Sequence, residues 1–187
     1  MNFLRKIDSS IIKKSDTDGL IRQYGKWNGK LGKFRRMPAG YFFYITDTCN
    51  LTCRYCWQRL DGSAPNSKPE LSLEEWIKII DKLPRFSFIG LTGGEATVFK
   101  DLNKLVQYIK KSHSATINTN GMLLDEERLR IFVESGLDNI SISIDGFSEN
   151  FDKAREHQGL FDKIVKNIKK LNQIKKELNA SKPTLTI

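Results

Sequence analysis

The chain has 187 residues, of which 39% are hydrophobic and 28% are charged, a composition typical of a water-soluble globular domain. It contains no apolar run close to the roughly 18 residues of a membrane-spanning helix, and residues 1–16 lack the apolar core and cleavage site of a secretory signal. The sequence therefore predicts a cytoplasmic protein that does not contact a membrane, in a compartment where structural disulfides are rare.

Positive charge is concentrated at the N-terminus. Residues 1–40 contain ten Lys or Arg against three Asp, a surplus of seven, whereas residues 41–187 contain 21 against 19. We therefore divide the chain into a basic N-terminal arm, residues 1–40, and a nearly neutral body, residues 41–187. Such an arm can contact nucleic acid or an acidic protein, and it can equally be a solvated segment that lies on the body.

From residue 41 the body alternates between predicted strands and predicted helices. Runs rich in aromatic and β-branched residues predict strands at 41–46, 86–91, 115–119, 139–144 and 184–187. Apolar residues at helical spacing predict helices at 72–83, after Asp101, after Asp125 and around 161–171. Ser72 with Glu75 forms a capping-box pattern, and both aspartates are expected to cap the helices that they precede.

This alternation predicts the fold. Strands separated by helical crossovers cannot pair as hairpins, so they favour a parallel sheet, open or rolled into a barrel. A complete (β/α)₈ barrel needs roughly 250 residues, and this chain supplies about four units and the start of a fifth. We therefore predict an α/β fold, a parallel partial TIM-type barrel truncated at the fifth strand, with the C-terminal part of the core missing after residue 187.

Unusual residues follow four successive predicted strands, at the ends where parallel sheets form their sites. The first strand leads into all three cysteines of the chain, and the later strands lead into Gly93–Gly94–Glu95, Thr119–Asn120 and Ser143. Taken singly, these later residues could be ordinary turn or strand residues. Their placement at the same end of four strands predicts one shared site.

Cys49, Cys53 and Cys56 have the spacing C-x₃-C-x₂-C on a loop that leaves a strand. A structural zinc site needs four ligands, and the two histidines, His113 and His157, are distant in the sequence, although a catalytic zinc with an open position stays possible. Iron–sulfur clusters are held by thiolates, usually four for a four-iron cluster. Three thiolates would leave one iron without a protein ligand, and that iron could bind a small molecule.

The cysteine motif, with Tyr55 directly before the third cysteine, resembles the signature of the radical S-adenosylmethionine (SAM) superfamily. The resemblance covers residues 41–187 and implies that the three cysteines hold a [4Fe–4S] cluster whose free iron chelates SAM. It further implies that one electron from the cluster cleaves SAM to methionine and a 5′-deoxyadenosyl radical, which abstracts hydrogen from a substrate. The sequence identifies no further catalytic residue.

The resemblance also assigns SAM-binding roles to residues outside the cysteine motif. These residues are Tyr55, Gly93, Gly94, Glu95, Thr119, Asn120, Ser143 and Arg155. Tyr55 would lie near the adenine, and Glu95, in the family's GGE turn, would accept a hydrogen bond from the methionine ammonium. Arg155 would hold the SAM carboxylate, but it could equally be a surface residue of a helix. Ala96 departs from the family, which often has proline at this position.

Within the superfamily, the TNG and SIDG segments followed by Asp152, Arg155 and Gly159 are most similar to molybdenum-cofactor enzymes, peptide maturases and sulfatase-maturing enzymes. Glycyl-radical-activating enzymes share most of these motifs and remain an alternative. The resemblance implies an electron donor such as a flavodoxin or a ferredoxin. The substrate, whether a peptide, a small molecule or RNA, stays open.

Two readings from other functional classes compete with a radical SAM enzyme. One is a non-catalytic iron–sulfur protein, which would have no use for Glu95 and the polar strand ends. The other is an RNA-binding protein whose basic arm would bind through its charges and through Tyr24, Trp27 and Phe34.

Overall fold

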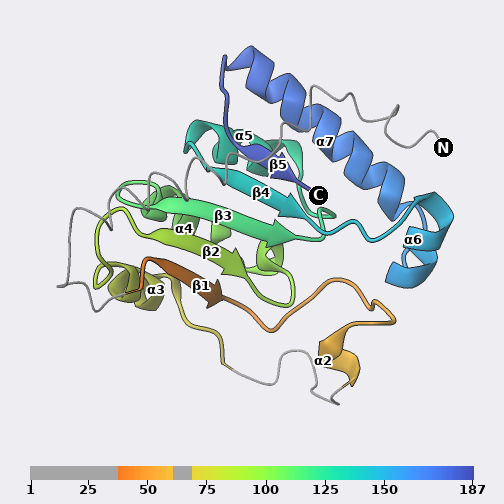
Figure 1. Ribbon diagram of the computed structural model, residues 1–187, viewed down its shortest axis with the longest axis horizontal. Coiled ribbons are helices and arrows are strands. Elements are labelled where there is room, and N and C mark those ends of the chain that lie inside the picture. The colour runs from red at the N-terminus through yellow and green to blue at the C-terminus, as the bar shows by residue number, and fades with distance from the viewer. Residues whose placement is uncertain (1–37, 61–68) are drawn as a thin grey trace.

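The computed structural model describes residues 38–60 and 69–187 (Figure 1). Residues 1–37 of the predicted basic arm lie outside the described residues, as do Tyr24, Trp27 and Phe34. The division into an arm and a body therefore stays a prediction. Within the described ranges, no helix combines the length and the apolar character that a membrane crossing requires.

Five parallel strands form one sheet in the order of the chain. They are β1 (Gly40–Tyr44), β2 (Phe88–Thr92), β3 (Ser114–Thr119), β4 (Asn139–Ile142) and β5 (Thr184–Thr186). All five arrows in Figure 1 point to the same edge of the sheet, so the carboxyl ends of the strands lie together. The predicted parallel α/β fold is confirmed.

Helices connect the strands and cover one face of the sheet. The structure contains α2 (Trp57–Leu60), α3 (Leu73–Ile80), the 3₁₀ helix η2 (Ala96–Val98), α4 (Leu102–Ile109), α5 (Glu126–Glu134), α6 (Ser148–Arg155) and α7 (Leu160–Glu177). Helices α3, α4, α5 and α7 contact one another in the order of the strands, and α3, α4 and α5 are seen behind the sheet in Figure 1. Helices on a single face are typical of the wall of a (β/α) barrel.

The hydrophobic core lies between the sheet and this helical layer. Ile89, Leu91, Ile117 and Ile140 are fully buried there, because alternate residues of a strand point to the same face. The opposite face of the sheet differs, since Phe42 is 68% exposed on it. This second face is the one that would line the inside of a barrel.

Two of the three predicted helix caps are confirmed. Ser72 and Glu75 form the capping box, with Ser72 Oγ accepting from Glu75 N at 3.3 Å and Glu75 Oε2 accepting from Ser72 N at 2.8 Å. Asp125 accepts from Arg128 N at 2.8 Å. The third, Asp101, occupies the predicted N-cap position of α4, but its carboxylate binds Lys104 Nζ at 2.9 Å and makes no cap hydrogen bond.

Helix α6 was not predicted from the sequence. It ends where Glu156 adopts a left-handed conformation (φ 53°), and α7 starts after Gly159 (φ 75°). Asp152 fixes this corner by accepting from Gly159 N at 2.6 Å and from Phe161 N at 2.9 Å. The predicted helix around 161–171 lies within α7, and α6 lies at the edge where the strands end (Figure 1).

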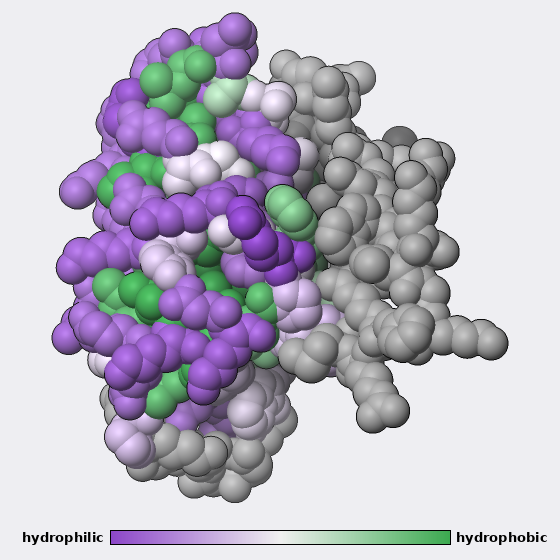
Figure 2. Space-filling model, turned by 90° about the vertical axis from the view of Figure 1, so that its left-hand side faces the viewer, coloured by the Kyte–Doolittle hydropathy of each residue, from purple (hydrophilic) through white to green (hydrophobic). Residues whose placement is uncertain are grey.

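Figure 2 views the molecule from the left-hand side of Figure 1, where the strands begin. The described residues on this side are mainly hydrophilic, with smaller apolar areas between them. Asp138, just before β4, is buried there and binds Lys110 and Lys182. This ionic cluster lies at the opposite end of the sheet from the cysteines.

Candidate cofactor site

The cysteine loop, residues 45–56, leaves β1 at the carboxyl edge of the sheet. Its start continues the strand pairing, since Ile45 N donates to Thr92 O at 2.9 Å. Its far end is bound to α6, because Arg54 N donates to Ala154 O at 3.0 Å. Backbone hydrogen bonds thus hold the loop at both ends.

The three predicted ligands lie together on this loop. Cys53 is buried, and Cys49 and Cys56 are partly buried. Burial raises the pKa of the Cys49 thiol, and the charges of Glu95, Cys53 and Cys56 raise it further, while the Leu51 amide opposes the shift. These charges act on Cys49 because the groups that carry them are close to it.

The donor set of this loop fits an iron–sulfur cluster. Three thiols on one loop match cluster ligation better than structural zinc, which needs a fourth ligand. Within the described residues, no three Cys, His, Asp or Glu side chains are arranged around one point as a single metal ion would require. A four-iron cluster differs, because each thiolate would bind a different iron atom.

The Gly93–Gly94 turn packs directly against the backbone of the cysteine loop. Gly94 N donates to Thr46 O at 2.8 Å, and Glu95 N donates to Thr48 O at 2.9 Å. A Cβ atom would lie 2.5 Å from Thr46 O if placed on Gly93, and 2.6 Å from Thr48 O if placed on Gly94. Both positions require glycine because a side chain would push the cysteine loop away.

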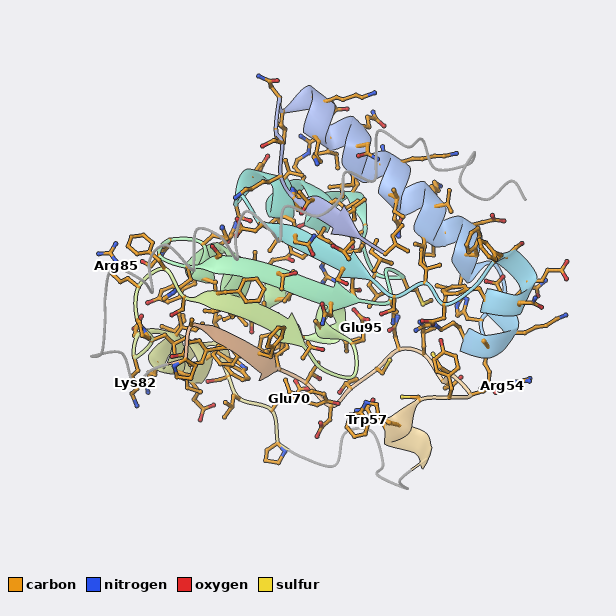
Figure 3. The ribbon with its side chains drawn as sticks, in the orientation of Figure 1. Arg54, Trp57, Glu70, Lys82, Arg85 and Glu95 are labelled. Atoms are coloured by element: carbon orange, nitrogen blue, oxygen red, sulfur yellow. The ribbon has the colours of Figure 1, made fainter. Side chains whose placement is uncertain are left out.

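Glu95 is buried at the ends of β2 and β3, close to the cysteine loop (Figure 3). Its Oε1 accepts from Thr97 N at 3.0 Å and from Thr119 Oγ1 at 2.6 Å, and its Oε2 accepts from Asn120 N at 2.6 Å. Two of the predicted SAM-binding residues, Thr119 and Asn120, thus hold Glu95 in place. A carboxylate oxygen can accept more than one hydrogen bond, so Oε2 retains capacity for the predicted methionine ammonium.

Ala96, which departs from the family pattern, begins the 3₁₀ helix η2 and is completely buried. The cap of this helix is Glu95, whose side chain accepts from Thr97 N. The turn after the two glycines is therefore fixed by a hydrogen bond to the glutamate, without proline.

Asn50 belongs to this site and was not found by the sequence analysis. Its Oδ1 accepts from Asn120 Nδ2 at 2.8 Å, and its Nδ2 lies 3.1 Å from the sulfur of Met122. The contact connects the cysteine loop to the end of β3. The signal available in the sequence was the position of Asn50, directly after Cys49.

Arg155 is 8% exposed, so the alternative of a surface helix residue is wrong. Its Nη1 lies 3.8 Å from Cys53 Sγ, and its Nη2 donates to Ser143 O at 3.2 Å and to the carboxylate of Asp145. Tyr55 also donates to Asp145 through its hydroxyl group. The predicted residues Tyr55, Ser143 and Arg155 are therefore brought together, and Asp145 is the partner that the predicted set lacked.

At the outer side of the loop, Glu70 accepts hydrogen bonds from the hydroxyls of Thr46 and Thr48. Figure 3 shows Glu70, Trp57 and Glu95 at this end of the molecule, whereas Lys82 and Arg85 lie at the other end. The residues predicted for the site thus occupy one edge of the sheet, and their direct contacts with a cluster or with SAM stay predictions.

A family model described as the radical SAM superfamily matches residues 43–181. The sporulation killing factor maturation protein SkfB of Bacillus subtilis is 32% identical over 164 residues, which are 84% of this chain and 38% of SkfB. A GTP 3′,8-cyclase of Clostridium perfringens is 29% identical over 142 residues, which are 72% of this chain and 44% of the cyclase. The chain thus spans less than half the length of these curated relatives.

Two solved structures have the same fold. Streptococcus suis SuiB bound to the precursor peptide SuiA has a TM-score of 0.62 at 19% identity, covering 87% of this chain and 37% of SuiB. Native anSMEcpe with bound AdoMet, which is SAM, has a TM-score of 0.60 at 21% identity, covering 73% of this chain and 41% of anSMEcpe. These likenesses support the barrel-type architecture.

The superfamily uses a [4Fe–4S] cluster together with SAM, the two cofactors predicted from the sequence. The matched region contains the three cysteines, the GGE turn and Arg155. Because that match extends over most of the chain, the protein belongs to the radical SAM superfamily.

Proposed function

We propose that this chain carries the cluster- and SAM-binding part of a radical SAM enzyme. The observation that supports this function best is the convergence of the cysteine loop, the buried Glu95 and Arg155 at one edge of the sheet. A bound cluster would supply the electron that cleaves SAM to methionine and a 5′-deoxyadenosyl radical.

The residues of the chain have four tasks in this proposal. Cys49, Cys53 and Cys56 hold the cluster, and the glycine turn keeps the loop that carries them against the sheet. Glu95 offers a carboxylate oxygen to the ammonium group of SAM. The exposed hydroxyl of Ser143 lies beside this region and is available to the rest of the cofactor.

A peptide is the substrate class that we propose. SkfB is a maturation protein, and SuiB has been solved with a precursor peptide. The face of the sheet opposite the helices also suits a peptide, because Asn118 and Ser141 are paired across β3 and β4 there, and Thr92 ends the neighbouring strand β2. Hydroxyl and amide groups can both donate to and accept from a peptide backbone.

GTP, the substrate named for one of the relatives, is less well matched. A triphosphate is usually bound by Lys or Arg. Among the described residues, the strands that form the face opposite the helices contain neither Lys nor Arg. Glycyl-radical activation remains an alternative within the same superfamily, and its substrate would be a glycine of a partner protein.

The test of the cofactor chemistry is anaerobic reconstitution. We expect about four iron and four sulfide ions per chain, and 5′-deoxyadenosine when dithionite and SAM are added. Cys49→Ala, Cys53→Ala and Cys56→Ala should each remove the cluster. Stoichiometric zinc without sulfide in anaerobically prepared protein would contradict the proposal.

The substrate class can be tested in the same assay. Short peptides encoded beside the gene and GTP are compared for their effect on the yield of 5′-deoxyadenosine. We expect a peptide to raise the yield and GTP to leave it unchanged. Stimulation by GTP, with no response to any of the peptides, would refute the proposed substrate class.

A further inference from the structure

Arg155 occupies an enclosed place between the cysteine loop and α6. Its Nη1 lies 3.8 Å from Cys53 Sγ, and its Nη2 donates to Asp145. The guanidinium carbon lies 5.5 Å from the centre of the Tyr55 ring and 5.3 Å from the centre of the Phe151 ring. A sulfur, a carboxylate and two aromatic rings therefore fix the direction in which the guanidinium group points.

These contacts leave the charge of Arg155 incompletely balanced. Asp145 is its one ionic partner among the described residues, and the side chain of Asp145 is 50% exposed to solvent, whereas that of Arg155 is 9% exposed. In addition, Nε of Arg155 is buried without a hydrogen-bond partner in the described part of the chain. A buried cation with a partly solvated counterion favours additional negative charge nearby.

We propose that Arg155 is a positioning residue that raises the reduction potential of the cluster by donating a hydrogen bond to the Cys53 sulfur. The inference rests on the proposed function, because it requires a cluster on Cys53. Reduction adds one negative charge to the cluster, so a cation beside a ligand sulfur stabilises the reduced form more than the oxidised form. Hydrogen bonds to ligand sulfurs are an established means by which proteins adjust such potentials.

Asp145 has the opposite effect on the cluster. Its carboxylate partly neutralises Arg155 and therefore weakens the stabilisation of the reduced form. Tyr55, which lies between Cys53 and Cys56 in the sequence, binds Asp145 through its hydroxyl and packs its ring against the guanidinium group. The loop that carries the ligands thus also holds the ion pair in position.

The test is the midpoint potential of the reconstituted cluster in the absence of SAM, followed by electron paramagnetic resonance. Arg155→Gln should shift the potential in the negative direction by roughly 59 mV. This shift corresponds to about a tenfold decrease in the equilibrium constant for one-electron reduction. Asp145→Asn should shift the potential in the positive direction by a smaller amount, because Asp145 is half exposed. Opposite shifts from the two members of one ion pair would not result from a general loosening of the structure.

Arg54→Gln is the matched control. Arg54 is adjacent to Cys53 in the sequence, but its side chain is 71% exposed and pairs with Glu156 at 3.5 Å. The variant removes the same charge from the same loop, and solvent should screen the effect. We expect a potential close to that of the parent protein.

An unchanged potential in Arg155→Gln would overturn the inference, and so would shifts of the same sign in Arg155→Gln and Asp145→Asn. If Arg155→Gln fails to assemble a cluster, Arg155→Lys, which keeps the charge, and Asp145→Asn take its place. A positive shift of the potential in Asp145→Asn would then support the inference, and a negative shift would overturn it. If Arg155→Gln binds SAM more weakly but keeps the potential of the parent, the role of Arg155 is limited to binding the SAM carboxylate. Absence of a cluster in the parent protein would instead refute the proposed function.

Discussion

Replacing Glu95 with glutamine tests the proposed SAM site most directly. The variant keeps the shape of the side chain and removes its negative charge. If Glu95 Oε2 accepts from the methionine ammonium, loss of this charged hydrogen bond should cost about 1.5–3 kcal/mol of SAM binding. The dissociation constant for SAM should then rise roughly ten- to a hundredfold.

The structure also predicts a cost in stability for Glu95→Gln. The carboxylate accepts from Thr97 N, Thr119 Oγ1 and Asn120 N, so both of its oxygens face hydrogen-bond donors. A glutamine amide must turn its NH₂ group toward one of the backbone N–H groups, and the bond lost there costs about 1–3 kcal/mol because the site is buried. We therefore expect a lower melting temperature, and the comparison of SAM affinities belongs at a temperature where both proteins are folded.

Isothermal titration calorimetry on anaerobically reconstituted protein provides the measurement, with iron content as the check on the cluster. Glu75→Gln is the matched control, because Glu75 is exposed at the start of α3 and binds Ser72 in the capping box. We expect Glu75→Gln to bind SAM like the parent protein. Equal SAM affinity in Glu95→Gln and the parent, at equal iron content, would remove Glu95 from the cofactor site.

Three further predictions concern the loop, the stability and the arm. Gly94→Ala should reduce the iron bound on reconstitution, because its Cβ would lie 2.6 Å from Thr48 O, and iron content equal to the parent would contradict this role. Asp138 has a lowered pKa because hydrogen bonds from Lys110, Lys182 and the Ala115 amide outweigh the effect of its burial, so its stabilising contribution is present above about pH 4 and is lost as the pH falls below that value. Asp138→Asn should therefore lower the melting temperature at pH 7, and the difference from the parent should become smaller as the pH falls below about 4; a difference that is absent at pH 7 would disprove the assignment. Deleting residues 1–36 should slow flavodoxin-driven SAM cleavage at low salt and leave dithionite-driven cleavage unchanged, whereas loss of RNA retention on filters with normal flavodoxin kinetics would favour RNA binding.

The order of the strands and helices could be predicted because each follows from a local pattern. Runs of aromatic and β-branched residues identified all five strands, helical periodicity identified the long helices, and the cysteine spacing identified the family. The strand predicted from residue 86 begins later, at Phe88, because Phe86 has a left-handed backbone (φ 63°). Likewise, Asp101 occupies the cap position but binds Lys104, a local partner that competes with the helix N-terminus.

The partners within the site could not be predicted in the same way. Tyr55 and Asp145 are 90 residues apart in the sequence, and Cys53 and Arg155 are 102 residues apart. Contacts of this kind depend on how the end of β4 and α6 are placed against the cysteine loop. The sequence motif gave Arg155 a function toward SAM, whereas its contacts with Cys53 and Asp145 are visible only in three dimensions.

Backbone hydrogen bonds hold the cofactor site together. The cysteine loop is bound through its backbone, by Gly94 N and Glu95 N on the side of β2 and by Arg54 N on the side of α6. These anchors fix the position of the segment that carries the three cysteines against the carboxyl edge of the sheet. A loop held in this way also keeps Glu95 and Arg155 next to the cysteines before either cofactor binds, so the cost of ordering the backbone is met during folding rather than during cofactor binding.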